Sequence, residues 1–132
     1  MDKNIHTQLL GFKKLGITIK KNAQGVYNNK YANLDEILEK VTGPLTKLGI
    51  VFYWRSTLEG LELVMRHNES ETELTSIIPY LQKQDAQKLG SNITYNKRYS
   101  IVAMLSLEDD DDDGQLASTP AKTTTNSNDD II

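Results

Sequence analysis

The pattern of hydrophobic positions predicts a helix near the start of the chain, followed by an irregular crossing. In residues 3–15, Ile5, Leu9 and Phe12 recur at the spacing of one helical face. Residues 16–32 are rich in Asn and Gly and lack a helical period, so we expect an extended or looped segment there.

A clearer helical pattern follows this crossing. Asn33 or Asp35 provides an N-cap, and Gly49 provides a C-terminal stop. Gly43-Pro44 is expected to kink the helix or to split off its last turn. The apolar residues at i, i+3, i+4 spacing are Leu34, Ile37, Leu38, Val41 and Leu45.

Three β-branched and aromatic runs occupy the middle of the chain, at residues 50–56, 58–67 and 72–80. The short polar links between them favour an antiparallel meander. Pro79 ends the third strand or marks a sheet edge, because proline has no N–H for the ladder. In the first run, alternation places Tyr53 and Arg55 on one face, opposite the face of its other aromatic residues.

A long helix is predicted from about Gln82 or Asp85 to Leu107, with a bend at Gly90-Ser91. Its predicted apolar stripe consists of Leu89, Ile93, Tyr95, Tyr99, Val102 and Leu105.

Residues 108–132 change character and are built mainly from Asp, Ser, Thr and Asn. They have too little apolar surface to offset the entropy of ordering, so we expect disorder. The fold class is therefore α+β, a β-β-β-α core in which an antiparallel meander packs on a long helix, with flanking N-terminal helices. We expect one domain over residues 1–107 and an acidic tail over residues 108–132.

Composition excludes several kinds of protein. The 132 residues contain no cysteine, which excludes disulfides and thiolate metal sites. No segment resembles a signal peptide or approaches the length of a membrane span, so the chain reads as soluble and intracellular.

The net charge of −3 conceals an uneven distribution. Residues 1–107 hold 14 Lys/Arg and 10 Asp/Glu, a net charge of +4, whereas residues 108–132 carry −7. This asymmetry indicates either a body that meets a polyanion or a soluble body with a solubilising tail.

Motifs for catalysis and for metal or nucleotide cofactors are missing from the sequence. The Asp109–Asp113 run imitates the start of a calcium loop, but the twelfth position, which should be Glu, is Pro120. There is no phosphate-binding glycine loop, and neither His6 nor His67 accompanies a nucleophile motif. We therefore expect no enzyme activity, no metal and no cofactor.

Cations interleaved with aromatic residues are the remaining candidate chemistry. Single-stranded nucleic acid binding needs cations for phosphates and aromatic faces for unstacked bases. For Tyr95 and Tyr99, at i and i+4, packing beneath the helix is the alternative. Lys97 and Arg98 lie about 100° apart on a helix, so they cannot both be buried. The predicted DNA-binding residues are Lys20, Lys21, Lys30, Tyr31, Arg55, Lys97, Arg98, Tyr95 and Tyr99.

Two motifs resemble those of a known family. Residues 30–50, KYANLDEILEKVTGPLTKLGI, resemble the KYA helix of the Erf family, the essential-recombination-function single-strand annealing proteins of phages. Residues 90–114 resemble its second signature, a GSxxxYxxRY helix followed by an acidic, glycine-ended segment. The two motifs lie in the family's order on either side of a β-rich middle.

The resemblance implies an ATP-independent protein that binds single-stranded DNA and anneals complementary strands in phage recombination. It implies a homo-oligomer, either a ring or a helical filament, in the cytoplasm of the infected host. A phage exonuclease or a host single-strand-binding protein is the implied further partner. Lys30 and Tyr31 match the first motif, and Tyr95, Lys97, Arg98 and Tyr99 match the second. In this setting we expect the tyrosines to fix the helix against the sheet while Arg98, or Lys97, reaches phosphates.

Other hypotheses remain open at this stage. A non-enzymatic adaptor with a basic face is the main alternative, and a nuclease built on the Asp run is a third. The tail either competes with DNA for the basic surface or keeps an oligomer soluble. Its segment NDDII also resembles the acidic-then-apolar segment through which bacterial single-strand-binding proteins recruit partners.

Overall fold

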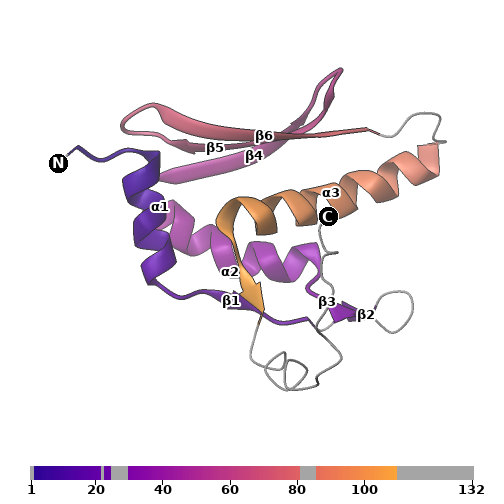
Figure 1. Ribbon diagram of the computed structural model, residues 1–132, viewed down its shortest axis with the longest axis horizontal. Coiled ribbons are helices and arrows are strands. Elements are labelled where there is room, and N and C mark those ends of the chain that lie inside the picture. Colours follow the sequence, from indigo (N-terminus) through magenta and orange to yellow (C-terminus); the bar gives the residue numbers. More distant parts are fainter. Residues whose placement is uncertain (1, 22, 25–29, 81–85, 110–132) are drawn as a thin grey trace, which may run out of the picture.

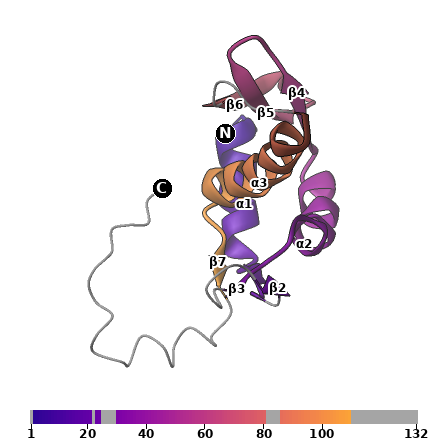
Figure 2. The same ribbon diagram turned by 90° about the vertical axis from the view of Figure 1, so that its right-hand side faces the viewer.

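The computed structural model describes residues 2–21, 23–24, 30–80 and 86–109, with backbone only for residues 23, 24, 30, 31 and 109. In Figure 1 a three-stranded sheet lies at the top, three helices lie beneath it, and short strands lie at the bottom. Figure 2 shows the same layers from the side, with α3 under the sheet in front of α1 and with α2 to one side. The predicted α+β class and β-β-β-α core are confirmed. The tail from residue 110 onward, expected to be disordered, lies outside the described residues.

The sheet is the antiparallel meander that the sequence predicts. It consists of β4 (Ile50–Ser56), β5 (Gly60–His67) and β6 (Thr72–Pro79), in the order β4-β5-β6. Pro79 is the last residue of β6, as expected. The face toward the helices carries Phe52 and Trp54, which pack against the core, and the buried Met65. The opposite face carries Tyr53 and Arg55, which confirms the predicted alternation.

Helix α1 (Ile5–Lys14) begins at Asn4, whose side-chain Oδ1 accepts hydrogen bonds from the backbone N–H groups of His6 and Thr7. Two of its side chains stabilise the ends of other helices. Gln8 Nε2 donates to the carbonyl of Leu48 at 2.8 Å, and Lys13 Nζ donates to the carbonyl of Ser106 at 3.2 Å. These bonds satisfy carbonyl groups that have no partner within a helix.

Helix α2 (Leu34–Lys47) begins at the first of its two predicted caps. Asn33 Oδ1 accepts from the Glu36 N–H at 2.9 Å in a capping box. Gly49 follows the helix with a φ of +78°, the left-handed conformation expected of a glycine stop. Pro44 lies inside a continuous helix, so the last turn is not split off.

Helix α3 (Ala86–Leu105) runs without interruption through Gly90 and Ser91. Its expected start at Gln82 or Asp85 lies outside the described residues. It ends in a Schellman motif, in which Leu107 N–H donates to the Val102 carbonyl and Ser106, at a φ of +52°, occupies the left-handed position.

The predicted apolar stripe of α3 is wrong at its two tyrosines. Ser100, Ile101 and Leu105 are the buried residues of the helix, whereas Tyr95 is 48% exposed and Tyr99 39% exposed. The side of α3 that packs against the rest of the protein therefore contains Ser100, Ile101 and Leu105 and not the tyrosines. Ser100 Oγ accepts a hydrogen bond from Trp54 Nε1 of β4, whereas the exposed tyrosines do not fix the helix against the sheet.

The described residues between 16 and 32 include three short strands, which agrees with the expected extended or looped crossing. Strand β1 (Thr18–Ile19) pairs in parallel with β7 (Glu108–Asp109), and β2 (Ala23–Gln24) pairs with β3 (Lys30–Tyr31). The first pairing joins the segment after α1 to the segment after α3. Glu108 and Asp109 therefore belong to the described body and not only to the acidic tail. None of the described helices has both the length and the apolar character needed to cross a bilayer.

Candidate nucleic-acid interface

The clearest aromatic feature on the surface is a pair of tyrosines on α3. The rings of Tyr95 and Tyr99 are stacked, with centroids 5.7 Å apart and planes 14° apart. The Arg98 guanidinium carbon lies 5.0 Å from the centre of the Tyr95 ring. One turn of α3 therefore presents two aromatic rings and a cation together, since residues i and i+4 are neighbours on a helix.

A second cation on the same turn lies against the sheet. Lys97 Nζ is 5.6 Å from the centre of the Trp54 ring, on the face of β4 that packs against the helices. Trp54 Nε1 donates to Ser100 Oγ at 3.0 Å, and that hydroxyl donates to the Lys97 carbonyl at 3.1 Å. Both Lys97 and Arg98 are partly buried. The strand and the hydroxyl of Ser100 thus hold the Tyr95–Tyr99 turn in place; we call this turn, with its two tyrosines and two cations, the α3 cluster.

The predicted cations Lys20 and Lys21 lie in a different place, at the end of β1. Lys20 lines a hollow of about 360 Å³ together with Lys40, Ile19 and the carboxylates Glu36 and Glu39 of α2. Lys21, the next residue in the chain, is exposed. This hollow is mixed in charge, so it is a weaker candidate for binding a polyanion than the α3 cluster.

Lys30 and Tyr31, which match the first family motif, form β3 directly before the cap of α2. Their side chains lie outside what the structure describes. The pairing of β3 with β2 places them on the same extended crossing as Lys20 and Lys21.

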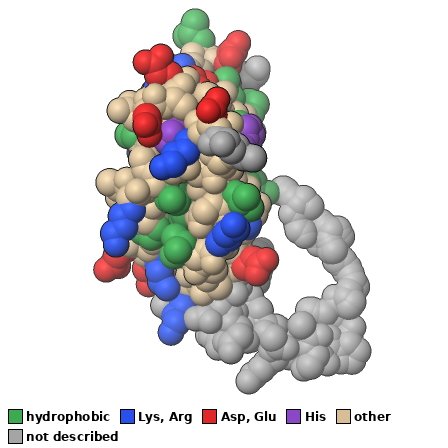
Figure 3. Space-filling view, turned by 90° about the vertical axis from the view of Figure 1, so that its left-hand side faces the viewer, with side chains coloured by type: hydrophobic (Ala, Val, Ile, Leu, Met, Phe, Trp, Pro, Cys, Tyr) green, Lys and Arg blue, Asp and Glu red, His purple; other side chains and the backbone are tan. Residues whose placement is uncertain are grey.

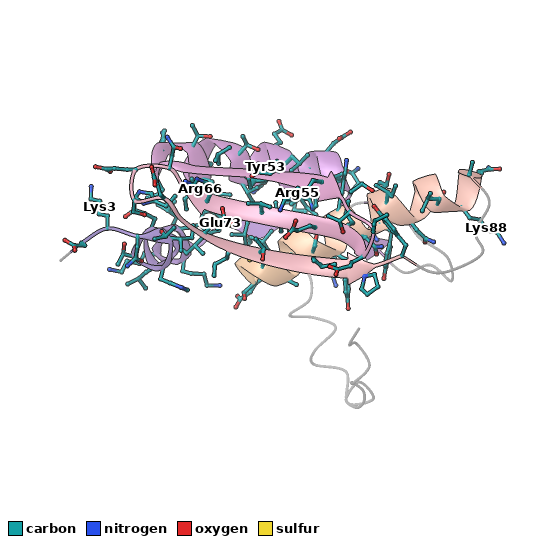
Figure 4. The ribbon with its side chains drawn as sticks, turned by 90° about the horizontal axis from the view of Figure 1, so that it is seen from above. Lys3, Tyr53, Arg55, Arg66, Glu73 and Lys88 are labelled. Atoms are coloured by element: carbon teal, nitrogen blue, oxygen red, sulfur yellow. The ribbon has the colours of Figure 1, made fainter. Side chains whose placement is uncertain are left out.

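Arg55 lies on the face of the sheet that points away from the helices, as Figure 4 shows together with Tyr53, Arg66 and Glu73. The strand register places Arg55 opposite Glu62, and Arg55 Nε lies 2.6 Å from Glu62 Oε1. The hydrogen bond and the charge of Glu62 raise the pKa of the Arg55 guanidinium. Arg66 and Glu73 form a second ion pair of 3.1 Å on this face. The cations of the outer sheet face are therefore neutralised by neighbouring carboxylates.

The sequence-predicted residues thus fall into separate groups. Tyr95, Lys97, Arg98 and Tyr99 lie together on α3, Lys20 lies beside α2 with Lys21 next to it in the chain, Lys30 and Tyr31 form β3, and Arg55 lies on the far face of the sheet. Lys40, which shares the hollow with Lys20, was missed because only the packing of β1 against α2 brings it there. In the described part of the chain, no three His, Cys, Asp or Glu side chains gather as a metal site requires.

Comparison with known families gives one finding. A family model described as ERF superfamily matches residues 12–130, which is most of the chain. No curated protein and no solved structure matches it. The match includes α2, the whole sheet and α3, and with them the α3 cluster and the hollow that Lys20 lines.

Proposed function

Because the chain belongs to the ERF superfamily, we propose that it binds single-stranded DNA and anneals complementary strands in phage recombination, without nucleotide hydrolysis. The observation that supports this function best is the α3 cluster. Two stacked, half-exposed rings and a guanidinium group on one helical turn are the ingredients that unstacked bases and phosphates need.

Annealing requires little of a protein beyond binding the strands. Cations that neutralise the phosphates of one strand reduce its repulsion of a second strand. Base pairing then supplies both the specificity and the driving free energy. We assign Arg98 and Lys97 to phosphates and the tyrosine pair to bases, with Lys20, Lys21, Lys30 and Tyr31 along the extended crossing as further contacts. Assembly into a ring or filament would align these contacts along one strand.

The direct test mixes two complementary labelled strands without ATP, with and without the protein. Faster duplex formation with the protein supports annealing. Strand cleavage that requires magnesium would instead indicate a nuclease. If the protein changes neither rate nor product, the adaptor hypothesis takes the place of annealing.

The two arginines of the predicted site are expected to behave differently. We expect Arg98→Ala to weaken binding of a single-stranded oligonucleotide by roughly tenfold, since a hydrogen bond to a charged group contributes about 1.5 kcal/mol. Arg55→Ala should change the dissociation constant by less than about twofold, because Glu62 already neutralises this guanidinium. Fluorescence anisotropy measures both. Equal losses in the two variants would include the outer face of the sheet in the interface and contradict the neutralisation of Arg55 by Glu62.

Binding is also expected to weaken with salt. If Lys20, Lys21, Lys30, Lys97 and Arg98 each neutralise one phosphate, log K should fall with log salt with a slope of about −3.5, roughly a hundredfold between 50 and 200 mM. In Arg98→Ala the slope should be smaller by about 0.7. Titrations at four salt concentrations give both slopes. An affinity that does not change over this range would contradict an electrostatic interface.

A further inference from the structure

A second surface, distinct from the α3 cluster, lies where α1 meets the C-terminal end of α3. It is a hollow of about 290 Å³. Leu10, on its rim, is 56% exposed, and Leu9 and Met104 are partly exposed. The lining residues are His6, Leu9, Leu10, Phe12, Lys13, Met104, Leu105 and Ser106. The floor is therefore apolar and part of it is open to water.

The rim of this hollow is basic. Helix α1 ends in Lys13 and Lys14, and its ten residues include no carboxylate. Figure 3 shows the side of the molecule on which α1 lies in Figure 1. Hydrophobic side chains there have Lys and Arg on either side of them, with Asp and Glu farther out on the same face. Lys13 Nζ also donates to the Leu105 and Ser106 carbonyls, which holds this cation at the edge of the hollow. A ligand that suits the surface is acidic at one end and apolar at the other.

The chain itself contains such a segment. Asp129 and Asp130 are followed directly by Ile131 and Ile132. The described body ends at Asp109, in β7. Next to the apolar hollow lies a smaller one of about 160 Å³, lined by Leu105, Ser106, Leu107 and Glu108 among others, so the chain leaves the body beside the proposed surface. Asp109 and Asp129 are 20 positions apart. A random coil of 20 residues spans on the order of 25 Å on average, and the hollow adjoins the place where the described chain ends.

We propose that residues 129–132 bind in the hollow between α1 and α3 of the same chain. Ile131 and Ile132 then cover Leu9, Leu10 and Met104, while the two aspartates approach Lys13 and Lys14. Because the segment is tethered, its effective concentration is roughly millimolar, so even a weak contact is populated. Binding removes Leu10 from water and neutralises the lysines of α1. This proposal does not depend on DNA binding, and its test uses no DNA.

Disulfide trapping in the full chain tests this proposal, because the sequence has no cysteine of its own. The test variant carries His6→Cys and Asn128→Cys. Both positions adjoin the proposed contact without removing an apolar partner. The control variant carries Leu58→Cys with Asn128→Cys, since Leu58 is fully exposed in the turn between β4 and β5. Under mild oxidation, non-reducing gels follow the intramolecular disulfide. We expect it to form at least about tenfold faster in the test variant.

Two further backgrounds separate the apolar and the charged contributions. One background carries Ile131→Ser with Ile132→Ser, and the other carries Asp129→Asn with Asp130→Asn. In each, the intramolecular disulfide of the test variant should form more slowly, at a rate closer to that of the control. His6 and Leu58 are exposed, so folding is expected to be unchanged, and circular dichroism verifies it. Equal rates in the two cysteine pairs would overturn the proposal. Disulfides that join two chains in place of the intramolecular product would also overturn it, and would assign the hollow to a second copy.

Discussion

Replacing both Tyr95 and Tyr99 with alanine is expected to weaken binding of single-stranded DNA by roughly fivefold to a hundredfold, because stacking of one base on an aromatic ring contributes about 1–3 kcal/mol. The two rings already stack on each other and are exposed, so they present a ready surface to a base. Annealing should slow in parallel, since the strand must be held before it is paired. Anisotropy and a strand-annealing assay measure the two effects.

Two controls show whether stacking is the cause. The double replacement Tyr95→Phe with Tyr99→Phe keeps both rings and removes both hydroxyls, so it should retain most of the affinity. Tyr53→Ala removes a ring of similar exposure (43%) from the outer face of the sheet, and it should leave binding nearly unchanged. If Tyr53→Ala and the α3 double variant lose the same affinity, the assignment of the interface to α3 is wrong.

The largest effect on stability is expected from Gly60→Ala. Gly60 begins β5 with a φ of +153°, which an alanine adopts only with strain. A Cβ atom there would lie 2.2 Å from the carbonyl oxygen of Ile78 and 2.8 Å from Pro79 Cα, both backbone atoms of β6. Neither atom can move without breaking the β5–β6 ladder. We expect a loss of about 3 kcal/mol or more in the free energy of unfolding, from backbone strain and overpacking of roughly 1–3 kcal/mol each.

Urea unfolding followed by circular dichroism at one protein concentration measures this loss. Gly90→Ala is the matched control, because a Cβ at Gly90 of α3 has open space around it. Since alanine favours helix, this change should stabilise the protein by about 0.5–1 kcal/mol. A Gly60→Ala protein as stable as the unchanged chain would mean that the β5–β6 hairpin has a different backbone from the one described.

The order of the main elements and their types were predictable from the sequence because they depend on local patterns. The apolar repeat of Leu34 to Leu45 needs only a helix and a cap, and the alternation in residues 50–56 needs only a strand with one buried face. The family motifs are likewise stretches of contiguous residues. These features are determined by residues that are close together in the chain.

The tertiary structure decided which side of each element is buried and which charges are neutralised. Periodicity alone placed Tyr95 and Tyr99 in the apolar stripe of their helix, yet α3 meets the sheet through Ser100, whose hydroxyl accepts a hydrogen bond from Trp54, 46 positions away. Arg55 looked like an available cation until the strand register placed Glu62 opposite it. Lys13 reaches carbonyl groups 92 and 93 positions away. A helix with several apolar or small positions has more than one face that can be buried. Only the shape and hydrogen-bonding needs of the surface it meets select among them, and those come from residues distant in the chain.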